Sequence, residues 1–368
     1  MNGWLTGRSL VGPIGIARQQ DGVAVREIVR IDPAAELQAL MATLASVLGE
    51  KVSARGVPLH DALLSWPRSW QATEVGEQRL RRLATAALRR SPLQPLADRA
   101  GRKELRVLAY HAVTNGRTFE QQLDYTLKHY EPVSLSQVLD AAAGRTLPSR
   151  AVLFTFDDGH RSWVDQVAPA LRSRGIPGVA FVVAGAVGSS VPYWWEAIGA
   201  SREDAAAMIR QLKSVPDDVR LRMLAERRRS AVGSPTTDEH LVPDDLKILE
   251  EAGLEIGNHT VSHPILTQCS NRKVAHEVRE AKEMLEDIIG HPVRSFAYPN
   301  GNHSPDVALT VAQSGHDVAF LFDHVVQSLP LANPMAVSRI RVNADDSIDT
   351  FAIRISGLHP AIHRLRRR

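Results

Sequence analysis

From Glu104 onward, apolar runs of strand length alternate with amphipathic helical patterns. This alternation predicts repeated βα units built around a parallel sheet. The candidate strands are residues 106–110, 151–156, 178–183, 254–256 and 295–298. Helix signals lie between them, and each ends at a glycine: residues 161–173 before Gly175, 243–252 before Gly253, and 271–289 between Ser270 and Gly290.

The first hundred residues follow a different pattern. Apolar stretches on either side of Asp21-Gly22 predict a β-hairpin. After Asp32 and Pro33, apolar positions at helical spacing predict a helix. A second helix is expected over residues 77–90. We therefore expect a mainly helical accessory region over residues 1–103, with its linker at 91–103. An α/β domain should follow over residues 104–368, with an insertion at about 184–240 and a basic C-terminal tail.

Composition excludes several protein classes. Hydrophobic residues make up 44% and charged residues 23% of the 368 residues, which excludes disorder of the whole chain. The net charge of +3 gives no support to nucleic-acid binding. Cys269 is the single cysteine, so no intramolecular disulfide can form.

The expected location follows from two missing sequence patterns. The sequence has no apolar run long enough to span a membrane, and its first twenty residues lack a signal-peptide pattern, so we predict a cytoplasmic protein. The arginines of helix 77–90 and of the tail, residues 364–368, favour a solvated surface. The alternative is a peripheral contact with anionic lipid at the inner membrane face.

Polar residues follow four of the predicted strands: Tyr110-His111, Asp157-Asp158-Gly159, residues 257–263 and residues 298–301. In parallel βα folds, the loops after the strands lie at one face and carry the chemistry. A closed or nearly closed barrel would bring these four loops together at a single site.

Two histidines four residues apart, His259 and His263, can bind one metal ion if their loop makes a helical turn. The pair gains weight because it follows a strand. A second pair at this spacing, His359 and His363, lies near the C-terminus and is interpreted as surface.

The adjacent carboxylates Asp157 and Asp158 can have two different roles. Neighbouring side chains in an extended chain point in opposite directions, so Asp158 can bind a metal while Asp157 accepts a proton beside it. A simple Asp-Gly turn is the alternative. One carboxylate and two histidines leave open positions for water and a carbonyl, as in catalytic metal sites.

Three motifs in fixed order resemble a known family. Residues 155–159 (TFDDG), 259–263 (HTVSH) and 296–301 (FAYPNG) resemble the first three motifs of the polysaccharide deacetylases, the NodB-homology carbohydrate esterases. The resemblance covers about residues 104–358. Tyr110-His111-Ala112-Val113, the form of the third motif and Tyr193-Trp194-Trp195 resemble the branch that modifies bacterial exopolysaccharides and poly-N-acetylglucosamine.

This resemblance implies a distorted (β/α)7 barrel and metal-dependent hydrolysis of an N-acetyl group. Asp157 would be the general base, and the metal ligands would be Asp158, His259 and His263. The backbone amide of Tyr298 would stabilise the oxyanion together with the metal. Zn²⁺ suits this ligand set, although Co²⁺, Ni²⁺ and Mn²⁺ tolerate the same ligands.

The sequence also departs from the family pattern. The third motif lacks the arginine that steadies the catalytic aspartate, and Arg339 is our candidate for that role. The late motif with the general acid has no clear counterpart, so His111 is a candidate acid, with a structural histidine as the alternative. Substrate contacts are proposed at Pro299 and Asn300, and also at Trp194 and Trp195, whose rings suit either sugar stacking or core packing.

The resulting hypothesis is removal of N-acetyl groups from hexosamine units of a polysaccharide or a glycan precursor. The expected partner is an N-acetylated glycan, and no nucleic acid is expected. A deacetylase of another amide or of an O-acetyl ester is one alternative. An inactive, glycan-binding barrel is another.

Overall fold

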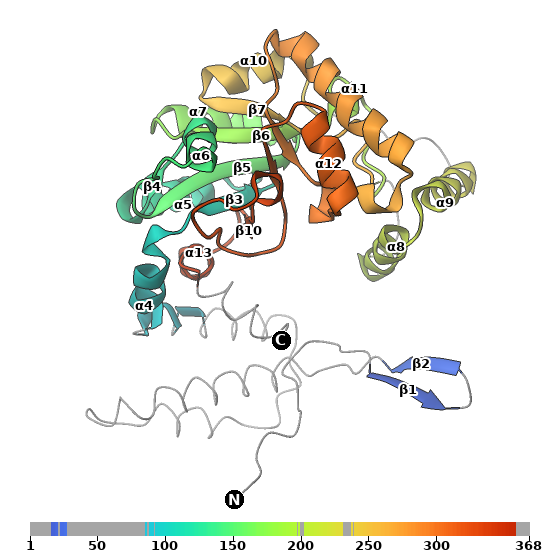
Figure 1. The fold of residues 1–368 in the computed structure, drawn as a ribbon, viewed down its shortest axis with the longest axis horizontal. Coiled ribbons are helices and arrows are strands. Elements are labelled where there is room, and N and C mark those ends of the chain that lie inside the picture. Colours follow the sequence, from blue (N-terminus) through green and yellow to red (C-terminus); the bar gives the residue numbers. More distant parts are fainter. Residues whose placement is uncertain are drawn as a thin grey trace, which may run out of the picture. The chain divides into compact units, whose positions relative to one another are not determined.

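The computed structural model describes residues 16–20, 23–27, 85–86, 88–91, 93–196, 198, 202–230, 237 and 239–357 (Figure 1). The chain forms two compact units, one of Met1–Arg81 with Ile362–Arg368 and one of Arg82–Ala361. No helix among the described residues is long and apolar enough to cross a membrane.

The first unit contains an antiparallel hairpin. Strands β1 (Ile16–Gln20) and β2 (Val23–Glu27) pair with Gln20 opposite Val23, which confirms the hairpin expected around residues 21–22. The helix expected after Asp32 lies outside the described residues, as do most of helix 77–90 and the tail with its two histidines. Those predictions stay open.

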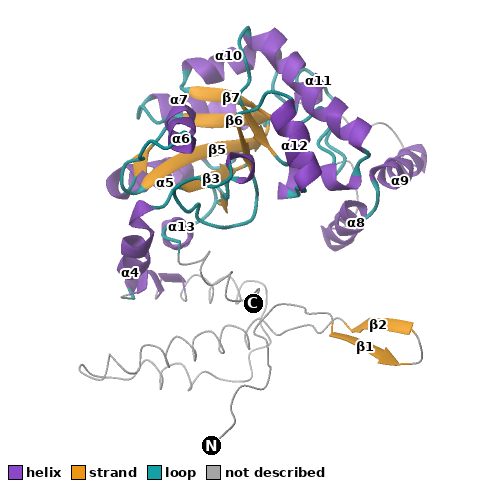
Figure 2. Ribbon diagram, in the orientation of Figure 1, coloured by secondary structure: helices purple, strands orange, loops and turns teal. Residues whose placement is uncertain are grey.

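The second unit is built on a parallel sheet in the order β10-β3-β5-β6-β7-β8-β9, with β4 paired to β5 (Figure 2). Every strand pair in it is parallel, which confirms the distorted barrel fold. The strands are β3 (Arg106–Tyr110), β4 (Glu131–Pro132), β5 (Ala151–Asp158), β6 (Gly178–Val182), β7 (Leu254–Asn258), β8 (Ser295–Ala297), β9 (Val318–Phe320) and β10 (Ile340–Arg341).

Helices connect the strands and cover the sheet from outside (Figures 1 and 2). The α-helices are α4 (Leu93–Ala100), α5 (Gly116–His129), α6 (Leu135–Ala142), α7 (Ala168–Arg172), α8 (Arg202–Ser214), α9 (Asp217–Ser230), α10 (Pro243–Glu251), α11 (Asn271–Ile289), α12 (Pro305–Gln313) and α13 (Ile348–Ile355). A π-helical turn, η2 (Trp163–Val167), precedes α7. The short 3-10 turns are η1 (Gly101–Lys103), η3 (Ala184–Ala186), η4 (Leu266–Gln268), η5 (Pro299–Gly301) and η6 (Pro334–Ala336).

Helix α11 shows why local signals locate some elements accurately. The Ser270 hydroxyl accepts a hydrogen bond from the Lys273 amide, and Gly290 ends the helix in the left-handed region at φ +81°. Both end signals belong to the local sequence, so α11 begins and ends where the sequence predicts.

The expected linker packs as part of the second unit. The Gln94 side chain of α4 donates to the Ala352 carbonyl of α13. The guanidinium of Arg106 is fully buried and donates to the carbonyls of Gly101 and Ile355. Residues 93–103 are therefore tied to the barrel by buried hydrogen bonds.

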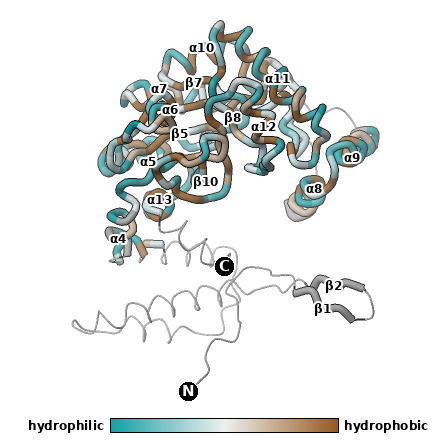
Figure 3. Tube along the Cα trace, in the orientation of Figure 1, coloured by the Kyte–Doolittle hydropathy of each residue, from teal (hydrophilic) through white to brown (hydrophobic). Residues whose placement is uncertain are grey.

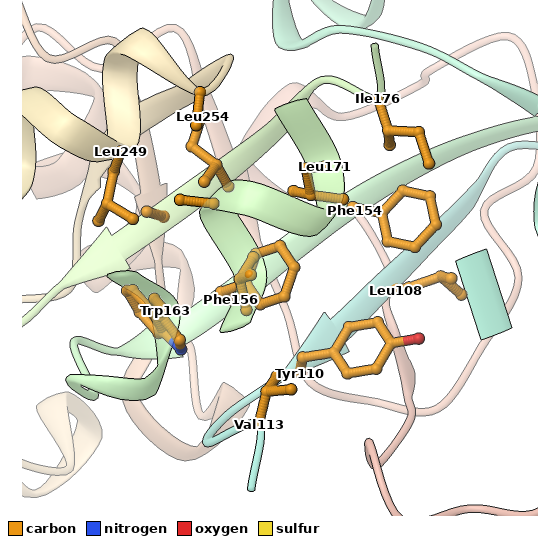
Figure 4. Close-up of a cluster of buried hydrophobic side chains, with 14 of the residues drawn as sticks. Leu108, Tyr110, Val113, Phe154, Phe156, Trp163, Leu171, Ile176, Leu249 and Leu254 are labelled. Carbon is orange, nitrogen blue, oxygen red and sulfur yellow. The ribbon is translucent and has the colours of Figure 1, made fainter. Parts of the chain in front are cut away.

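Alternating side chains of β5 face two different cores. Phe154 and Phe156 pack outward against Trp163 and Leu171 of the helix layer (Figure 4). Leu153 points the other way, into a core shared by neighbouring strands. Burial of both faces accounts for the continuous apolar runs in the sequence. Helix α9, by contrast with these buried strands, is made largely of hydrophilic residues (Figure 3).

Candidate active site

Asp157 and Arg339 form a buried pair inside the barrel. The guanidinium binds both carboxylate oxygens, with Nη1–Oδ1 at 2.6 Å and Nη2–Oδ2 at 2.7 Å. Arg339 is fully buried and Asp157 is 3% exposed. Further bonds from Arg339 to the Leu321 carbonyl and the Thr155 hydroxyl hold the guanidinium in place. The structure thus brings the candidate base and the candidate arginine together in a bidentate geometry.

The pair keeps Asp157 ionised. Burial alone would raise the pKa of this carboxyl, but the charge and hydrogen bonds of Arg339, with a contribution from His259, lower the pKa below its usual value. Asp157 is therefore a carboxylate at neutral pH, as a proton acceptor must be.

Asp158, His259 and His263 converge on one point. Asp158 Oδ1 lies 3.5 Å from His259 Nε2 and 3.5 Å from His263 Nε2. All three candidate ligand atoms lie within 4.8 Å of one another. Burial lowers the pKa of His263 to about 3, so its imidazole is neutral at pH 7, the form that binds metals.

The hydrogen-bond pattern of these residues fits a cation. His259 Nδ1 donates to the Ala297 carbonyl at 2.8 Å, so its Nε2 presents a lone pair toward Asp158. Asp158 Oδ1 is buried and has no hydrogen-bond partner among the described residues. A tetrahedral site with ligands at about 2.1 Å has edges of about 3.4 Å. The two distances of 3.5 Å match such an edge, and a cation between these facing acceptor atoms would satisfy them.

His111 lies at the rim of this cluster. Its Nε2 is 3.9 Å from Asp158 Oδ2, and its side chain is 40% exposed. The ring makes an edge contact with Phe322 at 5.5 Å between centroids. His111 therefore faces both the candidate metal site and solvent, rather than the core.

The third motif loop places both donors of Tyr298 on backbone carbonyls. The Tyr298 amide donates to the Phe320 carbonyl at 3.0 Å, and its hydroxyl donates to the Met335 carbonyl. The oxyanion role predicted for this amide stays a prediction. Pro299 is buried in the same loop. Gly301 has φ +75°, and a Cβ there would lie 2.6 Å from the Phe322 amide nitrogen.

The aromatic segment divides into different roles. Trp194 is 7% exposed, its indole donates to the His263 carbonyl at 3.4 Å, and it packs with Ile198 and Leu212. The sugar contact predicted for Trp194 is therefore wrong, and the core-packing alternative holds. Trp195 is half-buried and contacts His263 at 4.6 Å between ring centroids.

Two residues at this site received no individual role in the sequence analysis. The Tyr193 hydroxyl donates to the Asp158 carbonyl, which braces the candidate metal ligand. Lys213 of α8 donates to the exposed Asn300 side chain at 2.7 Å. Burial lowers the pKa of Lys213, while the charge of Asp158 opposes that shift, so the lysine lies within electrostatic reach of the site. From the sequence alone, a lysine in a charged helix is interpreted as a surface residue, and only the fold shows that it lies near the site.

The strand ends of the parallel barrel thus gather a carboxylate pair, two histidines and a buried arginine. Residues 144–319 match the family model described as polysaccharide deacetylase, so this part of the chain is similar to that family.

Two curated relatives match parts of the chain. A poly-beta-1,6-N-acetyl-D-glucosamine N-deacetylase of Escherichia coli strain K12 is 43% identical over 51 residues, 14% of this chain and 8% of that protein. A chitooligosaccharide deacetylase of Sinorhizobium fredii is 33% identical over 100 residues, 26% of this chain and 45% of that protein. The chain thus covers less than half of either relative.

Solved structures share the fold. The Streptococcus pyogenes deacetylase PplD in complex with acetate has a TM-score of 0.51 at 18% identity, covering 68% of this chain and 98% of that one. IcaB from Ammonifex degensii has a TM-score of 0.50 at 22% identity, and the match covers 69% of this chain and 97% of that one.

Proposed function

We propose that this protein is a metal-dependent N-deacetylase that acts on hexosamine units of an N-acetylated glycan. The observation that carries the proposal is the set of three acceptor atoms at cation spacing beside the Asp157–Arg339 pair. The similarity to poly-N-acetylglucosamine and chitooligosaccharide deacetylases supports an N-acetylhexosamine substrate.

The chain's own residues divide the work. Asp158, His259 and His263 would hold a divalent ion, with Zn²⁺ as the preferred candidate because neutral imidazoles and a carboxylate suit it. When bound, such an ion supplies Lewis acidity toward a water molecule and the acetamide carbonyl. Asp157 takes the proton of the attacking water, and Arg339 keeps its carboxylate oriented.

Collapse of the tetrahedral intermediate requires an acid for the departing amine. His111 is our candidate, since it lies at the rim on the Asp158 side and reaches solvent. Trp195, which borders His263, is the aromatic ring we propose for substrate contact.

The test separates the two adjacent carboxylates. Purified protein is assayed for bound metal and for acetate release from β-1,6-linked N-acetylglucosamine oligomers. Asp158→Asn should weaken metal binding, because a neutral amide replaces an anionic ligand. Asp157→Asn should retain the metal and lose about 10²- to 10⁴-fold in rate, because the proton acceptor is gone.

Other outcomes would replace the proposal. Acetate release from O-acetylated oligomers alone would identify an esterase. Glycan binding without acetate release by the metal-loaded protein would identify an inactive binding barrel. Full activity of both asparagine variants would refute the mechanism.

A further inference from the structure

The loop between the two candidate metal-binding histidines is held by a buried carboxylate on α11. Glu277 accepts the amides of Val261 and Ser262 at 3.0 and 2.9 Å and the Ser262 hydroxyl at 2.6 Å. Glu277 is 3% exposed. One side chain thus binds three donors within the five-residue histidine loop.

This loop requires stabilising contacts because two of its residues have uncommon backbone dihedral angles. Thr260 and His263 have φ values of +70° and +53°, the left-handed region that non-glycine residues rarely adopt. Asn258 accepts the Thr260 amide, and the Thr260 hydroxyl accepts the His263 amide. These internal bonds shape the loop, whereas Glu277 anchors it to a helix outside it.

The insertion contacts α11 close to Glu277 and also contacts the histidine loop itself. Asp217 at the start of α9 binds Lys273, which lies one helical turn before Glu277 with Nζ 4.0 Å from its carboxylate. On the other side, the Trp194 indole donates to the His263 carbonyl. Arg220 of α9 binds Asp217 and lies over the Trp194 ring at 5.1 Å. The insertion therefore contacts both the support and the end of the loop.

We propose that Glu277 is a positioning residue for the metal site, and that α9 of the insertion anchors it through Lys273. Holding the loop in its strained conformation before the metal arrives removes the ordering cost from metal binding. The inference rests on the part of the proposed function that places a cation between Asp158, His259 and His263.

The experiment measures zinc affinity of the full-length apoprotein by competition with a chromophoric chelator. Glu277→Gln places an amide among three donors, so its affinity should fall about 10- to 100-fold, the usual effect of losing an outer-shell partner. Glu280→Gln, an exposed glutamate one turn further along α11, is the matched control and should bind as the wild type does. At saturating zinc, the acetate-release rate of Glu277→Gln should return toward wild type.

A purely structural role predicts a different result, namely a lower melting temperature of the apoprotein with unchanged zinc affinity, and this result would overturn the proposal. If Glu277→Gln does not fold, Ser262→Ala removes one of the three bonds and should weaken zinc binding less. Lys273→Met removes the link between Asp217 of α9 and Glu277, and it should also weaken zinc binding. Unchanged affinity in both would refute the positioning role. Failure of the wild type to bind any of Zn²⁺, Co²⁺, Ni²⁺ and Mn²⁺ would refute the cation site itself, whatever the substrate proves to be.

Discussion

Replacing Arg339 by methionine is the most informative single change at this site. The methionine side chain is also unbranched at Cβ, but it is shorter and lacks the charge and the two hydrogen bonds to Asp157. The carboxylate then stays 3% exposed with no counter-charge in contact. Removing one partner of a buried ion pair costs about 3 to 5 kcal/mol, because the remaining charge cannot reach water.

The same change acts on the pKa of Asp157. Burial raises this pKa, and the arginine is the largest of the effects that lower it, so the variant should have a higher pKa than the wild type. A general base works only when ionised, so the acid limb of the pH–rate profile should move to higher pH. The rate at pH 6 should fall more than the rate at pH 8.

Three measurements check the reasoning: urea unfolding of the apoprotein, the pH profile of acetate release, and zinc affinity. Zinc affinity should stay near wild type, since Arg339 touches none of the three candidate ligands. Arg294→Met is the control, because it breaks an exposed pair with Asp317 and should cost about 1 kcal/mol at most. Asp157→Asn/Arg339→Met should recover part of the lost stability, since neither charge remains. Wild-type stability together with an unmoved acid limb would refute the assignment.

Two further variants test the surroundings. Lys213→Met removes the cation that binds Asn300, a predicted substrate contact, so kcat/KM should fall about tenfold while zinc affinity stays unchanged. An unchanged kcat/KM would show that this bond to Asn300 does not contribute to substrate binding. His316 is buried with its pKa lowered to about 4, mainly by burial, and it accepts from the Asn258 amide, so protonation opposes folding. Its contribution to stability is complete above about pH 6.5 and is lost as the pH falls toward 4, at about 1.4 kcal/mol per pH unit. The unfolding free energy of apo His316→Gln should therefore depend less on pH over this range than that of the wild type, and equal slopes would contradict the reasoning.

Sequence alone determined those features whose causes are local. The candidate strands confirmed as β3, β5, β6, β7 and β8 appear as apolar runs because both faces of a parallel sheet are buried. Helix α11 carries both of its end signals. The paired aspartates and the two histidines follow strands, so strand ends alone place them at one face of the barrel. Strands β4 and β10 are only two residues long, too short to give a recognisable apolar pattern.

Only the tertiary structure decided how distant segments meet. Arg339 is 182 residues from Asp157, and the pairing of β10 with β3 and of β3 with β5 brings its guanidinium within 2.6 Å of that carboxylate. The pairing of β8 with β9 joins the Tyr298 amide to Phe320, and packing against Ile198 and Leu212 buries Trp194, which sequence patterns could not reveal. Lys213 and Glu277 reach the site through helix packing. Short motifs encode which groups a site contains, whereas strand register and helix packing decide which of those groups touch, because such contacts depend on residues far apart in the chain.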